Sequence, residues 1–466
     1  MNYSDILTVF LVLFSLLSVR HFLRNKPRYY NIVLSIFLFV TACIIYLKSD
    51  LTSFLMFMIS LSINIIAGRA IFYAKNQNVK KIIFLAALIF DVMFLLSIKA
   101  SLQLFDLNIM PLGLSFLTFR EISFLADIYL GKVTLSKNIF SDAAYISMFT
   151  QLQSGPIVKF KEFTEADMYS EGTSDNTIIY NSIKGIKRYM IGFSKKVLIA
   201  DTLTVITQKA FTANIDELSC QMAWLGAICY SLQLYYDFSG YSDMAIGFTQ
   251  IAGFKCPENF NYPYISNSVS EFWRRWHITL GSWFKEYVYF PLGGSRVKKY
   301  RVFFNLLTVW LLTGLWHGIK PNFIVWGMIH FFMVMIEHFS GIHKTEKHSV
   351  KIIWRIVTLL TVIFAWVMFN SDSTLYGLRY WKTMFTYDNS KSPDTFRYYI
   401  QTYLWLIITA GAFAVPIYPL LEKKFSGKKS KAIYDIIHAA ALIVLFSISL
   451  SLLANRNNNT FAYANF

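Results

Sequence analysis

Apolar runs of about 20 residues recur along this chain, and they constrain its fold more than any other feature of the sequence. The candidate membrane spans are residues 5–19, 30–47, 51–73, 82–98, 108–129, 183–208, 222–247, 302–318, 321–338, 351–369, 399–420 and 434–454. A helix of that length crosses the hydrocarbon core of a bilayer and satisfies its own backbone hydrogen bonds there. Hydrophobic residues make up 55% of the 466 residues and charged residues 15%. The sequence therefore predicts an all-α, polytopic transmembrane protein with about 11–12 spans.

The net charge of +17 is distributed in a pattern that indicates membrane topology. Lys and Arg gather in every second loop, at Arg20–Arg28, Lys75–Lys81, Lys132–Lys137, Arg296–Arg301, Lys344–Lys351 and Lys423–Lys431. Basic loops remain on the cytoplasmic side of a membrane. The alternation predicts that these loops are cytoplasmic, and that both termini, the Asp372–Arg397 loop and the Asn455–Phe466 tail lie outside. Because the charge follows topology, we expect no nucleic-acid partner.

The sequence shows no internal boundary. It contains no repeat, Pro-rich linker or low-complexity tract, so we expect one integral-membrane domain over residues 1–466, with its motifs between about 110 and 340. The first apolar run starts at Asp5 and is followed by the basic Arg20–Arg28 segment, which favours a retained span over a cleaved signal peptide. The four cysteines lack CxxC spacing, so neither a disulfide framework nor a metal site is expected.

Three stretches are too polar to be simple lipid-facing helices, and the first is Met110–Gly131. It carries Arg120, Glu121 and Asp127 at membrane depth, so it is expected to face protein or a water-filled cavity. Arg120 and Asp127 stand seven residues apart, on one face of a helix. We expect them to form structural ion pairs with other helices.

The second polar stretch, Leu234–Gly247, contains the carboxylates Asp237 and Asp243. Six residues apart, they do not share a helix face, so capping and polar packing are favoured over an acid–base pair. We expect Ser239–Gly240 to loosen the helix between them. Another apolar run, residues 183–208, is interrupted by Lys195 and Lys196. This run is either a span or re-entrant, in which case residues 143–157 would cross instead.

The third polar stretch, Asn259–Arg301, is the richest in aromatic and basic residues. Ser268 followed by Glu271 is a capping box, which predicts that a helix begins there. The apolar stripe of this helix consists of Phe272, Trp276, Trp283 and Tyr287, and the basic residues off the stripe are Arg274, Arg275 and Lys285. The pattern predicts an amphipathic helix that lies in the membrane interface and carries His277.

A second histidine, His317, lies inside an almost uninterrupted apolar run, Val302–Ile319. A titratable side chain is costly in a bilayer, so an intramembrane histidine is a candidate for a functional site. The alternative is a histidine that is hydrogen-bonded in a helix interface. Gly314 and Gly318 flank His317 at helical spacing and allow another backbone or an acyl chain to come close to the imidazole. His317 is 16 residues beyond Arg301, or about 24 Å along a helix, whereas His277 lies in the cytoplasmic interface.

These segments resemble the membrane-bound O-acyltransferase (MBOAT) family, in particular its bacterial branch that acetylates polysaccharides and includes the membrane subunit of alginate O-acetylation. The matching strings are PLGLSFLTFREISFLADIYLG, FTQLQSGPIVKF, GFSKKVLIAD, LYYDFSGYSDMAIGF, ENFNYPYI, EFWRRWHITLGSWFKEYVYFPLGGSR and LTGLWHG. They occur in the family's order from about Pro111 to His330, and outside this region only hydropathy matches. Members often carry His-Gly after the next span, where this chain has His330–Phe331. We therefore expect His330 to serve in packing or as polar lining.

The resemblance implies a tunnel-shaped helical fold and two catalytic residues, His317 in GLWHG and His277 in WRRWH. It implies that an acyl thioester, here acetyl-CoA, enters from the cytoplasm. The basic residues Arg274, Arg275 and Lys285 are candidates to attract its phosphates, and the alternative is that they are ordinary interfacial anchors. The resemblance also implies a bacterial plasma-membrane location and a relay to an extracytoplasmic acceptor protein, such as an SGNH-type acetyltransferase, which modifies a glycan polymer.

Two other functions remain open at this stage. The same family includes transferases that move D-alanine from a carrier protein to teichoic acid. A polytopic transporter or flippase would also place polar segments in the membrane. Against a transporter, the chain shows no inverted internal repeat.

Overall fold

The computed structural model describes residues 3–23, 27–105, 111–151, 154–165, 175–253, 255–342, 345–387, 394–425 and 428–454. Helices are the only regular elements within these ranges, which confirms the predicted all-α fold. The chain divides into two compact units, Met1–Tyr189 with Ser242–Glu258, and Met190–Tyr241 with Asn259–Phe466. The single integral-membrane domain over residues 1–466 stays a prediction.

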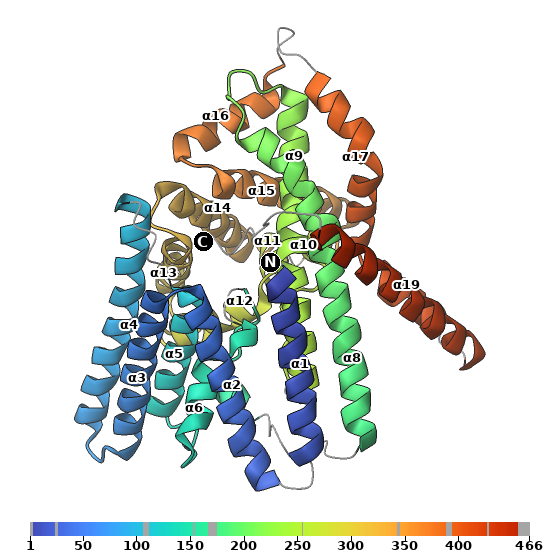
Figure 1. The fold of residues 1–466 in the computed structure, drawn as a ribbon. Helices are drawn as coiled ribbons and strands as arrows, with labels where there is room; N and C mark the ends of the chain where they lie inside the picture. The colour runs from blue at the N-terminus through green and yellow to red at the C-terminus, as the bar shows by residue number, and fades with distance from the viewer. Residues whose placement is uncertain are drawn as a thin grey trace. The chain divides into compact units, whose positions relative to one another are not determined.

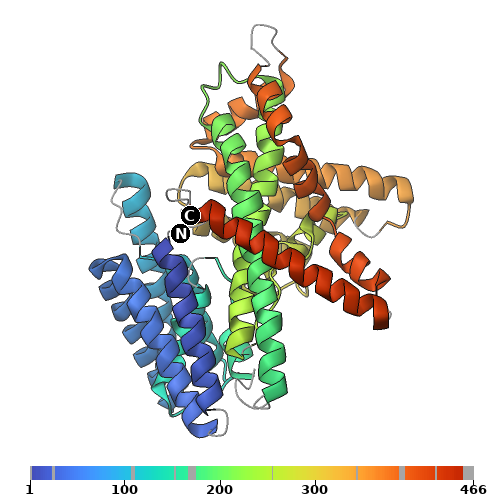
Figure 2. The same cartoon turned by 45° about the vertical axis from the view of Figure 1, so that its right-hand side comes forward.

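The first unit is built on the N-terminal helices. They are α1 (Tyr3–Leu23), α2 (Pro27–Ser49), α3 (Leu51–Tyr73), α4 (Gln77–Phe105), α5 (Leu114–Tyr129), α6 (Ile139–Ile146) and α7 (Phe160–Glu165). Helices α2, α3 and α4 lie side by side (Figures 1 and 2). Nearly every residue of α5 is buried. Helix α3 can approach α5 closely because Gly68 has no side chain. A Cβ added there would lie 2.3 Å from the Phe124 ring.

The second unit contains ten α-helices of the described residues in full. They are α9 (Asp201–Phe211), α11 (Val269–Arg275), α12 (Ile278–Phe284), α13 (Lys299–His317), α14 (Pro321–Ser340), α15 (His348–Asn370), α16 (Thr374–Phe385), α17 (Asp394–Phe413), α18 (Ile417–Lys424) and α19 (Lys428–Ala454). Two further helices, α8 (Asp175–Ser194) and α10 (Cys220–Ala252), have residues in both units.

Six helices within the described residues are long and apolar enough to cross a membrane. They are Asn31–Ser49, Leu51–Tyr73, Gln77–Gln103, Pro321–Ser340, His348–Asn370 and Ile433–Ala454. All six coincide with predicted spans, which supports the multi-pass membrane architecture. The other six predicted spans also overlap helices, although these are shorter or more polar, so their crossing stays a prediction. So does the predicted orientation, and the Asn455–Phe466 tail lies outside the described residues.

No re-entrant turn occurs at Lys195 and Lys196. The chain stays helical from Asp175 to Phe211, passing through a π-helical segment at Lys195–Ala200. Lys196 is buried, and its ammonium lies 2.6 Å from Asp201 and 2.8 Å from Asp237. The charge of Lys196, one of the two lysines that interrupt this run, is therefore neutralised by two aspartates inside the protein, as a buried charge requires.

Helix α10 continues without a break, so the expectation that Ser239–Gly240 loosens it is wrong. Gly240 instead permits close packing, since a Cβ there would lie 2.7 Å from the carbonyl oxygen of Gly192. Asp237 pairs with Lys196, and in the first unit Asp243 lies 2.6 Å from Arg188. The predicted polar packing of the two aspartates is confirmed, but both lie inside the helix and neither caps it.

The charged residues of α5 bind polar groups of neighbouring segments, and their ion pairs with other helices stay a prediction. Arg120 donates to the carbonyl of Met148 at 2.8 Å. Asp127 accepts from the backbone N–H of Lys161 at 2.9 Å and lies 3.4 Å from the ammonium of Lys132. The ion pair of Asp127 thus forms with the loop that follows its own helix, because that loop turns back over the end of α5.

Candidate active site

His317 is placed by a tight pairing of α13 with α14. A Cβ added at Gly314 would lie 2.9 Å from the carbonyl oxygen of Phe323, and one at Gly327 would lie 2.8 Å from that of Trp310. The two glycines therefore allow the helix backbones to touch, as the sequence predicted for Gly314. Helix α13 ends at His317, and α14 begins at Pro321, which suits the first turn of a helix.

Aromatic rings surround the buried imidazole of His317, which is only 4% exposed. Its centroid lies 4.9 Å from Trp326 and 4.9 Å from Phe369, and both rings meet it nearly at right angles. His317 is also the last residue of α13, where the helix dipole favours positive charge. This position stabilises an imidazolium once the ring has accepted a proton.

The segment that carries His277 is not the single amphipathic helix predicted from the sequence. Helix α11 ends at Arg275, Trp276 is extended, and His277 has a left-handed backbone with φ of 46° before α12 begins at Ile278. A left-handed residue cannot continue a helix, and for a side chain other than glycine it costs of order 1–3 kcal/mol. The predicted stripe is therefore interrupted: Phe272 lies in α11, Trp283 in α12 and Tyr287 in the π-helical segment Lys285–Tyr289 that follows. Trp276 and His277 occupy the bend between the two short helices.

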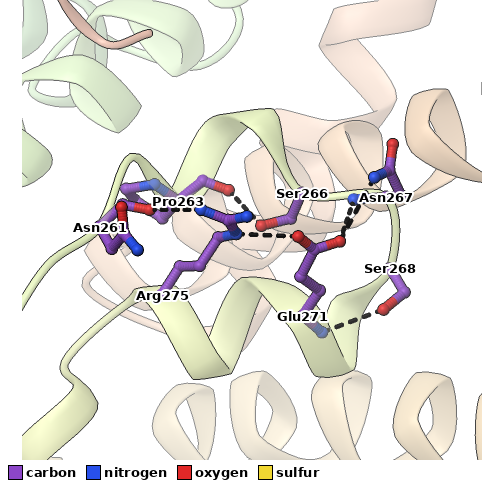
Figure 3. A network of polar contacts seen from close by, with 7 residues as sticks. All are labelled: Asn261, Pro263, Ser266, Asn267, Ser268, Glu271 and Arg275. Atoms are coloured by element: carbon purple, nitrogen blue, oxygen red, sulfur yellow. Dashed lines mark hydrogen bonds and ion pairs between the residues drawn. The ribbon is translucent and has the colours of Figure 1, made fainter. Parts of the chain in front are cut away.

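The start of α11 follows the predicted capping box in part (Figure 3). Ser268 Oγ accepts from the backbone N–H of Glu271 at 3.0 Å, as expected. The Glu271 carboxylate, however, accepts from the N–H of Asn267 at 2.9 Å and from Arg275 Nε at 2.8 Å. Burial raises the pKa of Glu271, but these hydrogen bonds to the charged form outweigh it and leave the pKa below its usual value.

The three predicted donor-binding cations lie in different settings. Arg275 donates to the carbonyl of Asn261 at 3.1 Å as well as pairing with Glu271, so its guanidinium is engaged in the fold (Figure 3). Arg274 and Lys285 are exposed, and the Lys285 ammonium lies 5.5 Å from the centre of the Phe290 ring. Arg274 and Lys285 therefore remain the more accessible candidates for an anionic donor.

Asn259 holds the bend at His277. Its backbone carbonyl accepts from the N–H of Ile278 at 2.9 Å. Its side-chain Oδ1 accepts from the backbone N–H of Thr279 at 3.2 Å and from Thr279 Oγ1 at 2.8 Å. One asparagine thus satisfies the start of α12 where His277 supplies no side-chain cap.

The same contacts decide the tautomer of His277. Nδ1 of the imidazole lies 3.2 Å from Asn259 Oδ1, an atom that must be the oxygen because the Thr279 backbone N–H donates to it. Nδ1 therefore carries the hydrogen, and Nε2 keeps its lone pair. Burial lowers the pKa of His277 to about 3, so the ring stays neutral at physiological pH.

The structure brings the two predicted catalytic histidines to one place. The Trp316 ring lies 4.5 Å from that of His317 and 6.4 Å from that of His277. Both imidazoles are buried, and each ring lies edge-on to this one indole. Neither here nor in the rest of the described residues is a group of three or more His, Cys, Asp or Glu side chains placed to hold a metal ion.

Helix α14 anchors α11 at two points. The carboxylate of Glu337, which is fully buried, accepts from the backbone N–H groups of Val269 at 2.6 Å and Ser270 at 2.8 Å. A carboxylate at the start of a helix stabilises it through the unpaired N–H groups and the dipole. Two turns earlier on α14, His330 Nδ1 accepts a hydrogen bond from Trp273 Nε1 at 3.2 Å. This contact agrees with the predicted packing role of His330.

Asn259 and Glu337 are two of the residues around the site that the sequence did not single out, and Trp326 is a third. Asn259 stands in the string ENFNYPYI, but its contacts join residues 18 to 20 positions apart and leave no periodic signal. Glu337 had a usable signal, since it is an acidic residue in an otherwise apolar span.

Comparison with known proteins places this arrangement in a family. The sequence model of the protein family MBOAT, membrane-bound O-acyltransferase, matches residues 32–378 of this chain. The chain is 37% identical over 329 residues to the "Probable alginate O-acetylase AlgI" of Pseudomonas syringae pv. tomato, covering 70% of this chain and 62% of that protein. It is 36% identical over 303 residues to the peptidoglycan O-acetyltransferase of Helicobacter pylori, covering 59% of this chain and 57% of that protein.

A more distant relative is the teichoic acid D-alanyltransferase of Bacillus subtilis, 28% identical over 272 residues, with 56% of this chain and 67% of that protein covered. The chain spans between 52% and 62% of the length of the alginate relatives it matches. The matched region includes both histidines and extends over most of this sequence. The chain therefore belongs to the membrane-bound O-acyltransferase family.

Proposed function

We propose that this chain is a membrane O-acyltransferase that takes an acetyl group from acetyl-CoA at the cytoplasmic face for the O-acetylation of an exopolysaccharide or cell-envelope glycan. The observation that carries the proposal is that the rings of His277 and His317 both lie near the Trp316 ring, at centroid distances of 6.4 Å and 4.5 Å. Relatives named for alginate and peptidoglycan O-acetylation support a glycan as the final acceptor.

In the proposed reaction His317 acts as the general base. Its neutral imidazole takes the proton of the accepting hydroxyl while the oxygen attacks the thioester carbonyl. The carbon–sulfur bond then breaks, and the proton passes to the departing sulfur. The imidazolium that forms in between is stabilised by the C-terminal end of α13.

The tetrahedral intermediate of such a transfer needs a hydrogen-bond donor for its oxyanion. Trp326 is suited to this role because its ring lies 4.9 Å from His317. Its Nε1 is buried and has no hydrogen-bond partner among the residues that the structure describes.

His277 has a different proposed role. Its Nε2 lone pair makes it a hydrogen-bond acceptor that stays neutral, as fixed by Asn259 and by burial. The amide N–H groups of a pantetheine arm are donors of matching chemistry. His277 would therefore orient the donor thioester, and exposed Arg274 and Lys285 would attract the phosphates of CoA.

The acyl group is proposed to pass to an extracytoplasmic acceptor protein, for example of the SGNH type, which then modifies the glycan. This relay requires a bacterial plasma-membrane location with the basic loops in the cytoplasm and both termini outside. Single cysteines at Asn214 and Thr345, probed with a membrane-impermeant thiol reagent, test the orientation. Asn214 should be labelled in spheroplasts, and Thr345 only after permeabilisation.

The experiment that tests the proposed activity uses purified full-length protein in proteoliposomes with radiolabelled acetyl-CoA. Release of CoA and transfer of label to an added hydroxyl acceptor are expected, and both should be lost in His317→Ala. The matched control is His338→Ala, which changes an exposed histidine. A wild-type protein that releases no CoA with any acceptor would contradict the proposal.

One alternative within the family has a specific observation behind it, the similarity to teichoic acid D-alanyltransferase. Transfer from a D-alanyl carrier protein, but not from acetyl-CoA, would favour that function. A transporter is the alternative from another class. Substrate flux that survives the loss of both histidines would favour it.

A further inference from the structure

A cluster of four buried polar side chains lies in the first unit, where α3, α4 and α5 pack together. Its members are Ser60 and Asn64 of α3, Asp91 of α4 and Glu121 of α5, and none is more than 1% exposed. Helices α3 and α4 are both apolar enough to span a membrane. The proposed acyl transfer uses none of these side chains.

Hydrogen bonds join the four side chains into one cluster. Ser60 Oγ donates to Glu121 Oε1 at 2.7 Å. Asn64 Nδ2 donates to Asp91 Oδ1 at 2.8 Å and to the backbone carbonyl of Ser60 at 3.1 Å. Both hydrogens of the Asn64 amide are therefore in use.

The charges of the cluster do not balance if both acids are ionised. Glu121 interacts electrostatically with Asp91 and with Arg120, the residue before it in α5. Arg120 contributes one positive charge, and its guanidinium donates to the carbonyls of Phe116 and Met148. Two carboxylates and one guanidinium leave one negative charge, which is costly at membrane depth.

Two acceptor atoms of the cluster lack a donor. Asp91 Oδ2 and Asn64 Oδ1 are buried and have no hydrogen-bond partner within the described part of the chain. They belong to the two side chains that already share the bond from Asn64 Nδ2 to Asp91 Oδ1. A carboxylic acid and a primary amide pair through two bonds, N–H to the acid carbonyl and O–H to the amide carbonyl.

We propose that Ser60, Asn64, Asp91 and Glu121 form an intramembrane proton-binding site, in which the proton resides on Asp91 Oδ2. Binding converts the Asp91 carboxylate into a carboxylic acid that donates to Asn64 Oδ1. With one proton bound, Asp91 Oδ2 becomes a donor and Asn64 Oδ1 gains a hydrogen bond. The same proton neutralises the one negative charge that Arg120 does not balance.

Other charged or titratable groups lie on the helices packed around the site. The buried ones are Tyr46 of α2, Lys99 of α4, Arg120 and Asp127 of α5, and Asp142 and Tyr145 of α6, while Arg69 of α3 is half-buried. Arg69 and Asp142 pair with each other at 2.7 Å. Tyr46 donates to the carbonyl of Leu112. Lys99 follows Asp91 by eight residues, or about 12 Å along α4, so Arg120 is the cation next to the cluster.

Infrared difference spectroscopy on purified full-length protein tests the site directly. At neutral pH the wild type should show the C=O band of a protonated, buried carboxyl. Asp91→Asn should remove this band, because the amide reproduces the shape and the donor of the acid without a titratable group. Glu121→Gln, the matched control, should keep it. A wild type without such a band, or a band that persists in Asp91→Asn, would overturn the proposal.

Thermal unfolding provides a second measurement. If the folded protein holds a proton that the unfolded chain releases, the melting temperature falls as the pH is raised through neutrality to alkaline values. Asp91→Asn should flatten this dependence. A wild-type melting temperature that rises with NaCl, but not with choline chloride at equal ionic strength, would assign the site to a metal cation and overturn the proton. If Asp91→Asn does not fold, the wild-type infrared band and the salt comparison still decide the outcome.

Discussion

Nδ1 of His277 lies 3.2 Å from Oδ1 of Asn259, and this pair fixes which face of the imidazole presents a lone pair. Asn259 also accepts two hydrogen bonds from Thr279, so a single side chain sets both the bend and the tautomer. A catalytic histidine is commonly oriented by a hydrogen bond on its other nitrogen. In this chain the hydrogen-bond partner of His277 Nδ1 is Asn259, which lies in the segment before α11, 18 residues earlier.

Asn259→Ala should reduce acyl transfer strongly and lower the free energy of unfolding by about 1–3 kcal/mol, because buried donors lose their acceptor. The measurements are acetyl transfer in proteoliposomes and thermal unfolding in detergent. Thr279→Val is the matched control, since it removes one of the hydrogen bonds to Asn259 but leaves the contact with His277. Equal loss of activity in both variants would show that the His277 contact is not the important one.

The lowered pKa of His277 predicts how stability depends on pH. An unfolded histidine titrates near 6.5, whereas the folded His277 titrates at about 3, so the unfolded chain binds the extra proton first. Stability is therefore full above about 6.5 and falls as the pH is lowered toward 3, by up to about 1.4 kcal/mol per pH unit. Unfolding of the wild type and His277→Gln between pH 4 and 8 should show a shallower slope in the variant. Parallel slopes would mean that His277 is not held neutral.

Glu337→Ala should detach the start of α11 from α14. The variant leaves two backbone N–H groups, those of Val269 and Ser270, without their buried acceptor. We expect a loss of about 1–3 kcal/mol in unfolding free energy, together with a large loss of activity because α11 leads into His277. Glu346→Ala, at an exposed acidic residue, serves as the control. Normal activity in Glu337→Ala would show that the anchor does not position the site.

Trp326→Phe separates packing from hydrogen bonding at His317. The phenyl ring keeps most of the aromatic contacts, but the N–H donor is lost. If this N–H stabilises the oxyanion, kcat should fall about 100-fold or more with little change in KM. Trp405→Phe, which alters an exposed tryptophan, should have no effect. A Trp326→Phe enzyme with wild-type kcat would exclude the indole as the donor.

The sequence predicted the helical class and the positions of the six long apolar helices. These features depend on apolar runs, which a sequence displays directly. The assignment of His277 and His317 to the active site stays a prediction. The bend at His277 could not be predicted, because Phe272, Trp276, Trp283 and Tyr287 have helical spacing whether or not the helix is broken. What breaks it is Asn259, and its contacts with Thr279 depend on tertiary packing.

The glycines show the same limit. Gly240 was expected to loosen α10, yet the absent side chain serves close packing against Gly192. From the sequence, a glycine in a helix is compatible with a flexible joint or with a close approach of another backbone. At Gly314 the predicted close approach of another backbone is confirmed, since a Cβ there would lie 2.9 Å from the carbonyl oxygen of Phe323.

The central claim is that His317 is the base of an acyl transfer that ends on a glycan. The most direct measurement is the acetate bound to the polymer in cells that express His317→Ala in place of the wild type, with the protein quantified in the membrane. A small residue beside Gly314 packs without strain, so normal abundance is expected together with the loss of polymer-bound acetate. Wild-type acetylation at normal abundance would contradict the account.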